Sequence, residues 1–401
     1  MARRRPPPHR DGMTSSAASF LPGLVLSRAL YEEAVRPLLD DAFPGLRHTA
    51  ARIGAGSEVL GFDTPRSADH EWGPRLELFL TPRDRARHGA AIRRMLAERL
   101  PKEVRGWPTH FEESGDPRDP VGRMSLSGGP VNHRVDVHDL DSWLTERLGL
   151  TQDAARRPDV RQWLALPQQR LAETTGGAVF HDGLGTLGAV REALAWYPDQ
   201  VWRYVLACQW QRLAQEEAFV GRCAETGDDL GAAVVAARLV RELMRLCLLL
   251  ERRYAPYAKW LGAAFARLPV AGTLTPVLRG VLGAADQPGR EAALCTAYGM
   301  VAALHNATGL TPPLDPACRP YHGRPFAVLR ADRFARALEE TVTDPWLRAL
   351  PPVGAVDQWA DSTDLLRYPH AVHAASLAAG RALADDAGET GTSGDPPPHR
   401  R

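Results

Sequence analysis

Two short motifs near the start of the chain carry residue types that could act on a phosphate ester. Gly56 and Ser57 follow a short apolar run, and the exposed backbone N–H groups of such a turn can bind a phosphate. Asp69 and Glu71 come next and are separated by one residue. In an extended segment, residues two positions apart project from the same face, so we expect both carboxylates to point the same way. Two carboxylates on one face suit a divalent cation, and a phosphate site beside that cation predicts nucleotidyl transfer.

This chemistry needs a third acidic side chain, because the cations that bind the triphosphate must also activate the attacking hydroxyl group. Asp136 is the candidate, since it lies between two valines in the alternating segment 133–138. From such a position in a strand, one carboxylate can reach a site on the neighbouring strand. The sequence therefore predicts Asp69, Glu71 and Asp136 as the catalytic residues and as the metal ligands.

These motifs resemble those of the nucleotidyltransferase superfamily that includes polymerase beta and kanamycin nucleotidyltransferase. Its members have a Gly-Ser pair at the start of a helix, two acids separated by one residue, and a distant third acid. The wider sequence resembles one bacterial family within this superfamily, which is catalogued as domain of unknown function 4037. The segments that carry the resemblance are 56–63, 67–75, 254–260 and 357–359.

The resemblance implies a metal-dependent enzyme that moves a nucleoside monophosphate from ATP, or another nucleoside triphosphate, to a hydroxyl group, with Mg²⁺ as cofactor. Gly56 and Ser57 would bind the outer phosphates. Arg75 or Lys259 would offset the charge that builds on the leaving pyrophosphate. The alternative for Arg75 is an ion pair at a strand edge, and the alternative for Lys259 is a surface position beside Trp260.

The acid pair departs from the family pattern in the residues that follow it. Segment 72–74 is Trp-Gly-Pro, and a proline cannot donate a hydrogen bond within a sheet. Asp69 and Glu71 could therefore lie on a loop or a bulge instead of a strand. Glu77, which lies in the clean alternation of 75–80, is the alternative to Glu71 as the second carboxylate.

The elements expected around the motifs begin with an α/β region. Periodicity predicts helices at 24–41 and 84–100. It predicts one strand that ends at Gly54 and further strands at 75–80, 124–126 and 131–137. The last two strands are expected to form a hairpin across 128–130. Helical periodicity dominates from residue 140 onward, at 188–196, 202–222, 230–254, 257–268, 290–307 and 331–341. No repeat of fixed period is present, which favours a bundle.

The expected fold class is α+β. A nucleotidyltransferase-like mixed sheet with helices is expected at 19–150, followed by a mainly α-helical bundle domain at 151–385. Residues 1–18 and 386–401 contain runs of arginine, proline and small polar residues, and are expected to be disordered.

Composition favours a soluble, two-domain enzyme. The chain has 401 residues, of which 44% are hydrophobic, and its net charge of +1 argues against a surface that coats nucleic acid. The sequence contains no long apolar run and no hydrophobic signal core, so we expect no membrane association and a cytoplasmic location. Five widely spaced cysteines fit reduced thiols in that compartment.

The expected function is nucleotidyl transfer to an unidentified acceptor. A small molecule is favoured as acceptor by analogy with the superfamily, and protein nucleotidylation (AMPylation) is an alternative. A further alternative is a catalytically inactive nucleotide-binding or interaction module on the same fold. Convergence of the carboxylates of Asp69, Glu71 or Glu77, and Asp136 is the geometry that the enzyme requires.

Overall fold

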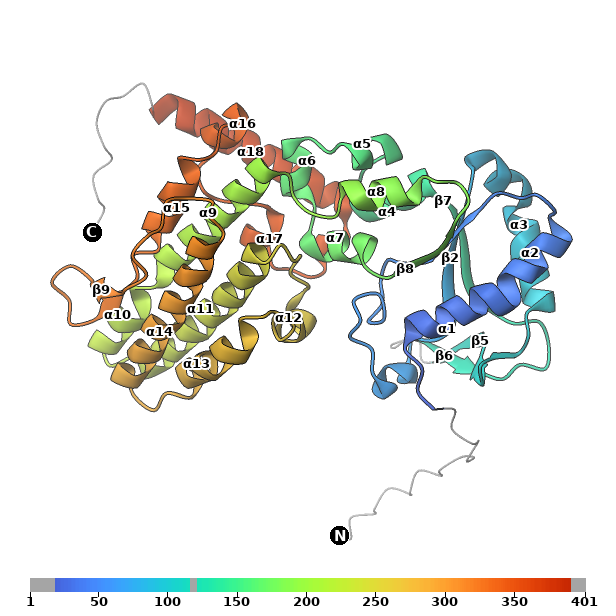
Figure 1. The fold of residues 1–401 in the computed structure, drawn as a ribbon, viewed down its shortest axis with the longest axis horizontal. Helices are drawn as coiled ribbons and strands as arrows, with labels where there is room; N and C mark the ends of the chain where they lie inside the picture. The colour runs from blue at the N-terminus through green and yellow to red at the C-terminus, as the bar shows by residue number, and fades with distance from the viewer. Residues whose placement is uncertain (1–18, 116–120, 391–401) are drawn as a thin grey trace, which may run out of the picture. The chain divides into compact units, whose positions relative to one another are not determined.

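The structure is a computed structural model that describes residues 19–115 and 121–390. Contacts divide the chain into two compact units (Figure 1). The first comprises the residues up to Arg52, Gly56–Val137 and Ala178–His181, and the second comprises Ile53–Ala55, His138–Gly177 and the residues from Asp182 onward. The predicted α+β class is confirmed, with a sheet in the N-terminal half and many helices in the C-terminal half.

The stretches expected to be disordered lie mostly outside the described residues. This holds for 1–18 and for 391–401. The last helix, α18 (Pro369–Thr390), takes in the start of the C-terminal stretch. None of the helices in the described parts of the chain is long and apolar enough to cross a membrane.

A four-stranded sheet with the order β7-β2-β1-β8 forms the centre of the first unit. Its strands are β1 (Thr49–Arg52), β2 (Arg75–Leu80), β7 (Arg134–Asp139) and β8 (Ala178–Asp182). Strands β1 and β2 are antiparallel, with Ala51 opposite Glu77. The predicted strand at 75–80 is confirmed, whereas β8 comes from beyond residue 150 and adds an edge strand to the sheet.

Leucines occupy alternate positions of β2, and they determine which face of the sheet packs against the core. Leu76, Leu78 and Leu80 are buried in the same apolar cluster as Val135 and Val137 of β7. Side chains at alternate positions point to the opposite face, so the polar residues of both strands lie together there. Helices on the core side are α1 (Gly23–Ala29), the π-helix η1 (Leu30–Val35), α2 (Arg36–Ala42) and α3 (Pro82–Arg99), whose residues contribute to the cluster or pack against it.

Short strands complete the first unit and correct one expectation. Strand β3 (Glu103–Val104) pairs with β4 (Trp107–Pro108), and β5 (His110–Glu113) pairs with β6 (Gly122–Ser125). The predicted hairpin between 124–126 and 131–137 is wrong, because β6 pairs with β5 and β7 pairs with β2. Val135 and Val137 are buried in the main core, and this burial favours pairing of β7 with β2 over the predicted hairpin with β6.

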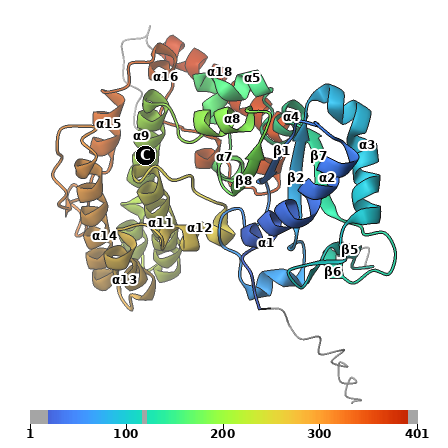
Figure 2. The ribbon, with the colours of Figure 1, turned by 45° about the vertical axis from the view of Figure 1, so that its right-hand side comes forward.

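The second unit is built from helices (Figures 1 and 2). Those before the long helices are α4 (Leu140–Leu148), α5 (Gln152–Arg156), α6 (Val160–Ala165), α7 (Gln168–Thr175) and α8 (Leu187–Ala193). The bundle contains α9 (Asp199–Glu216), α10 (Phe219–Glu225), α11 (Asp229–Leu250), α12 (Ala258–Phe265), α13 (Ala271–Gly283), α14 (Gln287–Ala307) and α15 (Asp332–Glu339). The remaining elements are the paired strands β9 (Arg319–Pro320) and β10 (Ala327–Val328), then α16 (Pro345–Ala349), α17 (Val356–Trp359) and the 3-10 helix η3 (Leu365–Arg367).

Aromatic packing joins three helices of the bundle. Trp210 of α9 stacks on Phe334 of α15 at 4.4 Å between ring centroids. The indole nitrogen of Trp210 donates to His305 Nδ1 of α14 at 3.1 Å. Burial lowers the pKa of His305 to about 4, so the ring stays neutral and accepts this hydrogen bond.

The predicted helix at 202–222 is interrupted, because α9 ends at Glu216 and α10 begins at Phe219. The buried carboxylate of Glu217 accepts hydrogen bonds from the backbone N–H groups of Leu329, Arg330 and Ala331 at 2.9, 3.2 and 3.0 Å. These groups precede α15, so the acidic side chain also interacts with the positive end of a helix.

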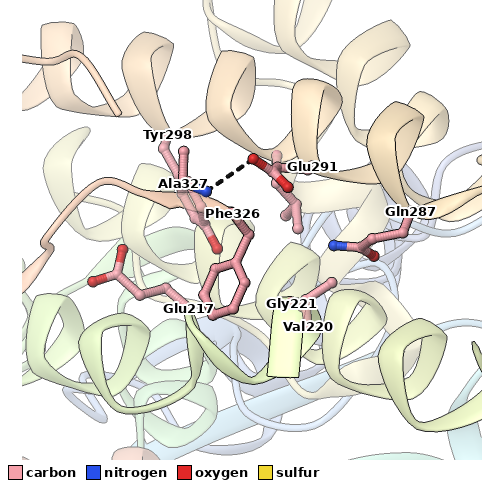
Figure 3. Close-up of a pocket in the computed structure, with 9 residues that line it drawn as sticks. Glu217, Val220, Gly221, Gln287, Glu291, Tyr298, Phe326 and Ala327 are labelled. Atoms are coloured by element: carbon pink, nitrogen blue, oxygen red, sulfur yellow. Dashed lines mark hydrogen bonds between the residues drawn. The ribbon is translucent and has the colours of Figure 1, made fainter. Parts of the chain in front are cut away.

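Glu217 lines a cavity of about 10 Å³, together with Glu291 and Phe326 (Figure 3). Glu291 accepts the backbone N–H of Ala327 at 2.8 Å. A volume of this size is about that of one water molecule. Both carboxylates therefore bind backbone segments of the bundle, and the cavity is too small for a substrate.

We expect Glu217→Gln to lower the free energy of unfolding by about 1–3 kcal/mol, since an amide NH₂ cannot accept and leaves a buried backbone N–H without its acceptor. Burial raises the pKa of Glu217 to about 7, although the three N–H donors oppose this shift. The folded state thus binds the proton more tightly than the unfolded chain, and this site loses stability as the pH rises from about 4.5 to about 7.

Denaturant unfolding at pH 5 and pH 8 measures both effects. Glu225→Gln is the matched control, because Glu225 forms an ion pair with the half-exposed Arg324 and should change stability by less than about 1 kcal/mol. Equal stability of the two variants would contradict the role assigned to Glu217.

Candidate functional site

Three potential metal ligands converge on the polar face of the sheet. Glu77 of β2 and Asp136 and His138 of β7 each offer one ligand atom, and these atoms all lie within 4.8 Å of one another. The two strands are neighbours, and Asp136 and His138 are two positions apart in one strand, so their side chains share a face. Glu77 is buried, His138 is partly buried and Asp136 is exposed, so the group opens to solvent at Asp136.

A chain of buried charges lies beside Glu77. Arg52 Nε and Arg75 Nη2 both donate to Glu58 Oε1 at 2.7 Å, and Arg52 Nη1 lies 3.6 Å from Glu77 Oε1. The side chains of Arg52, Glu58 and Glu77 are only 3%, 1% and 6% exposed. Burial raises the pKa of Glu58, but the two guanidinium groups outweigh it and hold this pKa below its ordinary value.

Gly56 lies directly against this cluster. Its φ of 154° is in the region that favours glycine, and a Cβ atom there would lie 2.5 Å from Arg52 Nη2 and 2.6 Å from Arg75 Nη2. A side chain at this position would therefore collide with both guanidinium groups. The absence of a side chain lets the backbone approach the two cations and also Glu58, the anion that they bind, whose Oε2 lies 2.6 Å from the same Cβ position.

Ser57 begins a turn, and no α-helix starts there. Val59 N donates to Gly56 O at 3.1 Å, and Phe62 N donates to Ser57 O at 2.8 Å. The helix start implied by the family resemblance is thus wrong for this chain. The backbone N–H of Ser57 donates to no other described residue, so it is available to a ligand.

The structure does not bring Asp69 and Glu71 into the group around Asp136. Asp69 ends the 3-10 helix η2 (Pro65–Asp69), is about half exposed, and lies 2.7 Å from His70 Nδ1. Glu71 has a φ of 47°, and its Oε1 accepts the backbone N–H of Gly122 at 2.5 Å. The extended segment expected for this pair is wrong, because a capping box of Thr64 and Ser67 forms a helical turn there.

Asp69 and Glu71 belong to no group of three metal-ligating side chains within the described part of the chain. The polar contacts of Glu71 are with Gly122 and with Arg134, whose Nη2 lies at 3.7 Å. Glu77 takes the place of Glu71 as the carboxylate next to Asp136.

The two predicted cations have different surroundings. Arg75 is the first residue of β2 and is 16% exposed at its side chain, where it pairs with Glu58. Lys259 is exposed on α12 in the second unit, and its Nζ lies 4.9 Å over the ring of Trp260. Lys259 therefore lies at the surface beside a tryptophan, which is the alternative to phosphate binding that the sequence left open for this residue.

Three residues of the site, His138, Arg52 and Glu58, were not predicted from the sequence. His138 shares the alternation of Asp136, and this two-residue spacing was a signal for it. Arg52 interrupts an otherwise apolar strand just before the Gly56 turn, which was a signal for a buried ion pair. Glu58 carried no signal, because an acid in a turn is ordinarily exposed.

Comparison with known proteins finds a family model that matches part of the chain. The family model described as domain of unknown function 4037 matches residues 163–261. A solved structure described as a nucleotidyltransferase-like protein from Exiguobacterium sibiricum 255-15 is 13% identical, with 79% of this chain and 91% of that chain covered and a TM-score of 0.31. No curated protein matches. The chain is thus similar, from α6 to α12, to a family whose function is unassigned.

Proposed function

We propose that this protein is a metal-dependent nucleotidyltransferase whose metal site is Glu77, Asp136 and His138. The observation that carries the proposal is the convergence of these three side chains within 4.8 Å on adjacent strands. The glycine turn and the guanidinium groups of Arg52, which lies beside Glu77, and of Arg75, which lies beside Gly56, add the features of a phosphate site. Neither Asp69 nor Glu71 is needed for this arrangement.

The donor set fits a divalent cation. Carboxylate oxygens suit Mg²⁺ and Mn²⁺, and an imidazole nitrogen beside them also suits Zn²⁺ and other transition metals. Mg²⁺ therefore remains the proposed cofactor, and His138 makes Mn²⁺ the first alternative to assay. When bound, the cation would supply positive charge to the phosphate oxygens of the nucleotide.

Other residues of the first unit would contact the phosphates, hold the guanidinium groups in place and accept a proton. Arg75 and the backbone N–H of Ser57 would contact the outer phosphates of ATP or another nucleoside triphosphate. Glu58 would hold the two guanidinium groups in place through its 2.7 Å contacts. Asp136, the exposed member of the group, would accept the hydroxyl proton of the acceptor.

The proposed reaction forms one bond and breaks one. The acceptor oxygen bonds to the α-phosphorus while the bond from that phosphorus to pyrophosphate breaks, and the proton goes to Asp136. A small molecule with a hydroxyl group is the proposed acceptor, and a protein hydroxyl group is the alternative.

Pyrophosphate release from ATP and GTP, with Mg²⁺ or Mn²⁺ and a panel of alcohols, tests the function. We expect metal-dependent release that EDTA abolishes and that Asp136→Asn lowers by at least about 10²-fold, because the proton acceptor and a metal ligand are lost together. Release that is unaffected by EDTA or by this substitution would refute the proposal.

A catalytically inactive nucleotide-binding module is the second candidate. It is favoured by Arg52, whose Nη1 lies 3.6 Å from Glu77 Oε1, because a cation of the protein itself already neutralises one of the ligands. Nucleotide binding without pyrophosphate release, measured by calorimetry under the same conditions, would support this candidate over the enzyme.

A further inference from the structure

The second unit contains a cavity of about 230 Å³ that is lined by four arginines. Arg212 comes from α9, and Arg238, Arg241 and Arg245 come from α11. The other side of the cavity is the segment 357–361, which begins within α17. All of these residues belong to the second unit, whereas Glu77 and Asp136 belong to the first.

The three arginines of α11 share one helix face. Positions 238, 241 and 245 are spaced by three and four residues, which places their side chains next to one another. Like charges at this spacing repel, so the cluster is unfavourable unless anions lie among them. Burial lowers the pKa of Arg241, and the neighbouring Arg245 lowers it further.

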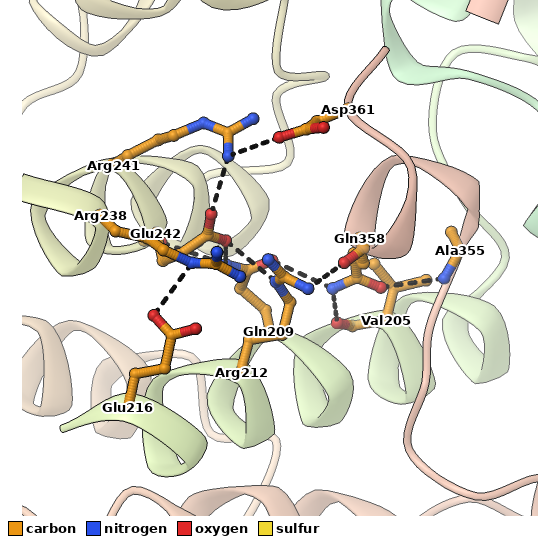
Figure 4. Close-up of polar contacts among 10 residues, drawn as sticks. All are labelled: Val205, Gln209, Arg212, Glu216, Arg238, Arg241, Glu242, Ala355, Gln358 and Asp361. Atoms are coloured by element: carbon orange, nitrogen blue, oxygen red, sulfur yellow. Dashed lines mark hydrogen bonds and ion pairs between the residues drawn. The ribbon is translucent and has the colours of Figure 1, made fainter. Parts of the chain in front are cut away.

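The carboxylates nearby neutralise only part of this charge. Glu242 is buried, and its oxygens contact Arg212 Nε at 3.2 Å, Arg241 Nη1 at 3.4 Å and Gln209 Nε2 at 2.7 Å (Figure 4). Glu216 pairs with Arg238 at 2.9 Å. The guanidinium of Arg245 makes no ion pair or hydrogen bond with any described residue, but its charge acts on Glu242 and lowers the pKa of that carboxyl.

The two acids that line the cavity neutralise little of the charge on the arginines. Asp361 is 75% exposed and lies 3.6 Å from Arg241, so solvent screens it. Asp357 is buried, accepts the backbone N–H of Gln168 at 2.8 Å, and has its pKa raised by burial, although Arg245 opposes that shift. Four guanidinium groups thus have four acids near them, of which only Asp357 and Asp361 line the cavity, and of these two one is already hydrogen-bonded and the other is screened.

Hydrogen bonds hold the walls of the cavity in place. Arg212 Nη1 donates to the backbone carbonyl of Gln358 (Figure 4). The Gln358 side chain donates to Gln209 Oε1 at 3.1 Å and to Val205 O at 2.9 Å, and it accepts from Ala355 N at 3.0 Å. Arg212 of α9 is therefore preorganised against the segment that forms the other side of the cavity, which reduces the cost of binding.

From this geometry we infer that the cavity binds the phosphate groups of a small phosphorylated molecule. Guanidinium groups present planar pairs of N–H donors that match phosphate oxygens, and a multiply charged anion can contact several of them at once. A tricarboxylate such as citrate spreads its charge over three separate groups, whereas each phosphate group concentrates its charge on oxygens that match the guanidinium donors. The volume is below the roughly 300–1,000 Å³ of pockets for drug-sized ligands, so the ligand, or its bound part, is small.

Calorimetric titration of the full chain with pyrophosphate, in EDTA, tests the inference. EDTA removes divalent cations, so metal-dependent binding at the sheet site does not contribute. We expect pyrophosphate to bind, inorganic phosphate to bind more weakly, and the carboxylate citrate to bind more weakly still. No binding of pyrophosphate, or equal binding of citrate, would overturn the inference.

Substitutions then locate the site. Arg245→Gln should weaken pyrophosphate binding at least about tenfold, and Arg245→Lys should weaken it less, because lysine keeps the charge and loses the paired donors. Arg238→Gln, at the half-exposed edge, is a second variant in case Arg245→Gln does not fold. Arg279→Gln, an exposed residue of α13, is the matched control and should bind as the wild type does.

Equal weakening by Arg245→Gln and Arg279→Gln, or no change in either cavity variant, would overturn the inference. Glu77→Gln distinguishes it from the proposed enzyme activity. This variant should lose pyrophosphate release from ATP and retain pyrophosphate binding in EDTA, since Glu77 lies in the other unit. Loss of that binding in Glu77→Gln would also contradict the inference.

Discussion

Glu77→Gln is expected to reduce metal-dependent pyrophosphate release at least about 10²-fold, whereas Asp69→Asn should leave it within about twofold. Glu77 offers a ligand atom to the group with Asp136 and His138, and loss of even an outer partner of a metal site typically costs about 10–100-fold. Asp69 is half exposed at the end of η2 and interacts with His70.

Initial rates at saturating nucleotide, with the metal concentration varied, measure this difference. The apparent metal affinity should fall in Glu77→Gln and stay unchanged in Asp69→Asn, which serves as its control. The opposite pattern, with Asp69→Asn inactive and Glu77→Gln active, would return the metal site to the motif at residues 69–71 and refute the assignment to the sheet.

Glu58→Gln should lower the free energy of unfolding by about 3–5 kcal/mol, which is the cost of leaving buried charges without their partner. Glu58 Oε1 accepts from both Arg52 and Arg75 at 2.7 Å, and its side chain is 1% exposed. A neutral amide removes the charge that both guanidinium groups face. Urea unfolding followed by circular dichroism measures the change.

Asp41→Asn is the matched control in the same unit. Asp41 pairs with Arg99 at 2.8 Å, but both side chains are about half exposed, so the expected change is below about 1 kcal/mol. The deficit of Glu58→Gln should also depend on pH. The pKa of Glu58 is lowered on folding, so its charge stabilises the fold above the ordinary glutamate pKa, and this contribution is lost as the pH falls through the lowered value. A deficit that persists unchanged in acid would contradict this account.

Helices and strands with regular periodicity were predictable from the sequence. The expected helices at 230–254, 257–268 and 290–307 correspond to α11, α12 and α14. Helix α13 was missed because Pro276 lies inside it, and proline ordinarily ends a helix. The break at Glu217 could not be predicted, because it depends on backbone N–H groups more than a hundred residues later in the chain.

The candidate site was predictable in part. Asp136 and the alternative carboxylate Glu77 each lie in a clean alternation, and alternation is a local property that the chain itself determines. Asp69 and Glu71 matched a family motif, but their backbone conformation depends on the capping box at 64–67 and on the bond between Glu71 and Gly122. A motif records spacing along the chain and leaves the direction of side chains open.

The sequence by itself determined the α+β class, the turn at Gly56 and Ser57, and strands that carry Glu77 and Asp136 on a polar face. Only the tertiary structure decided that β7 lies beside β2, which brings Asp136 and His138 to Glu77, and that Arg52 and Arg75 share Glu58. Periodicity acts between neighbours in the chain, and so it is visible in the sequence. Strand order and buried ion pairs arise from segments far apart in the sequence, and they are settled by which arrangement buries the apolar faces and pairs the buried charges.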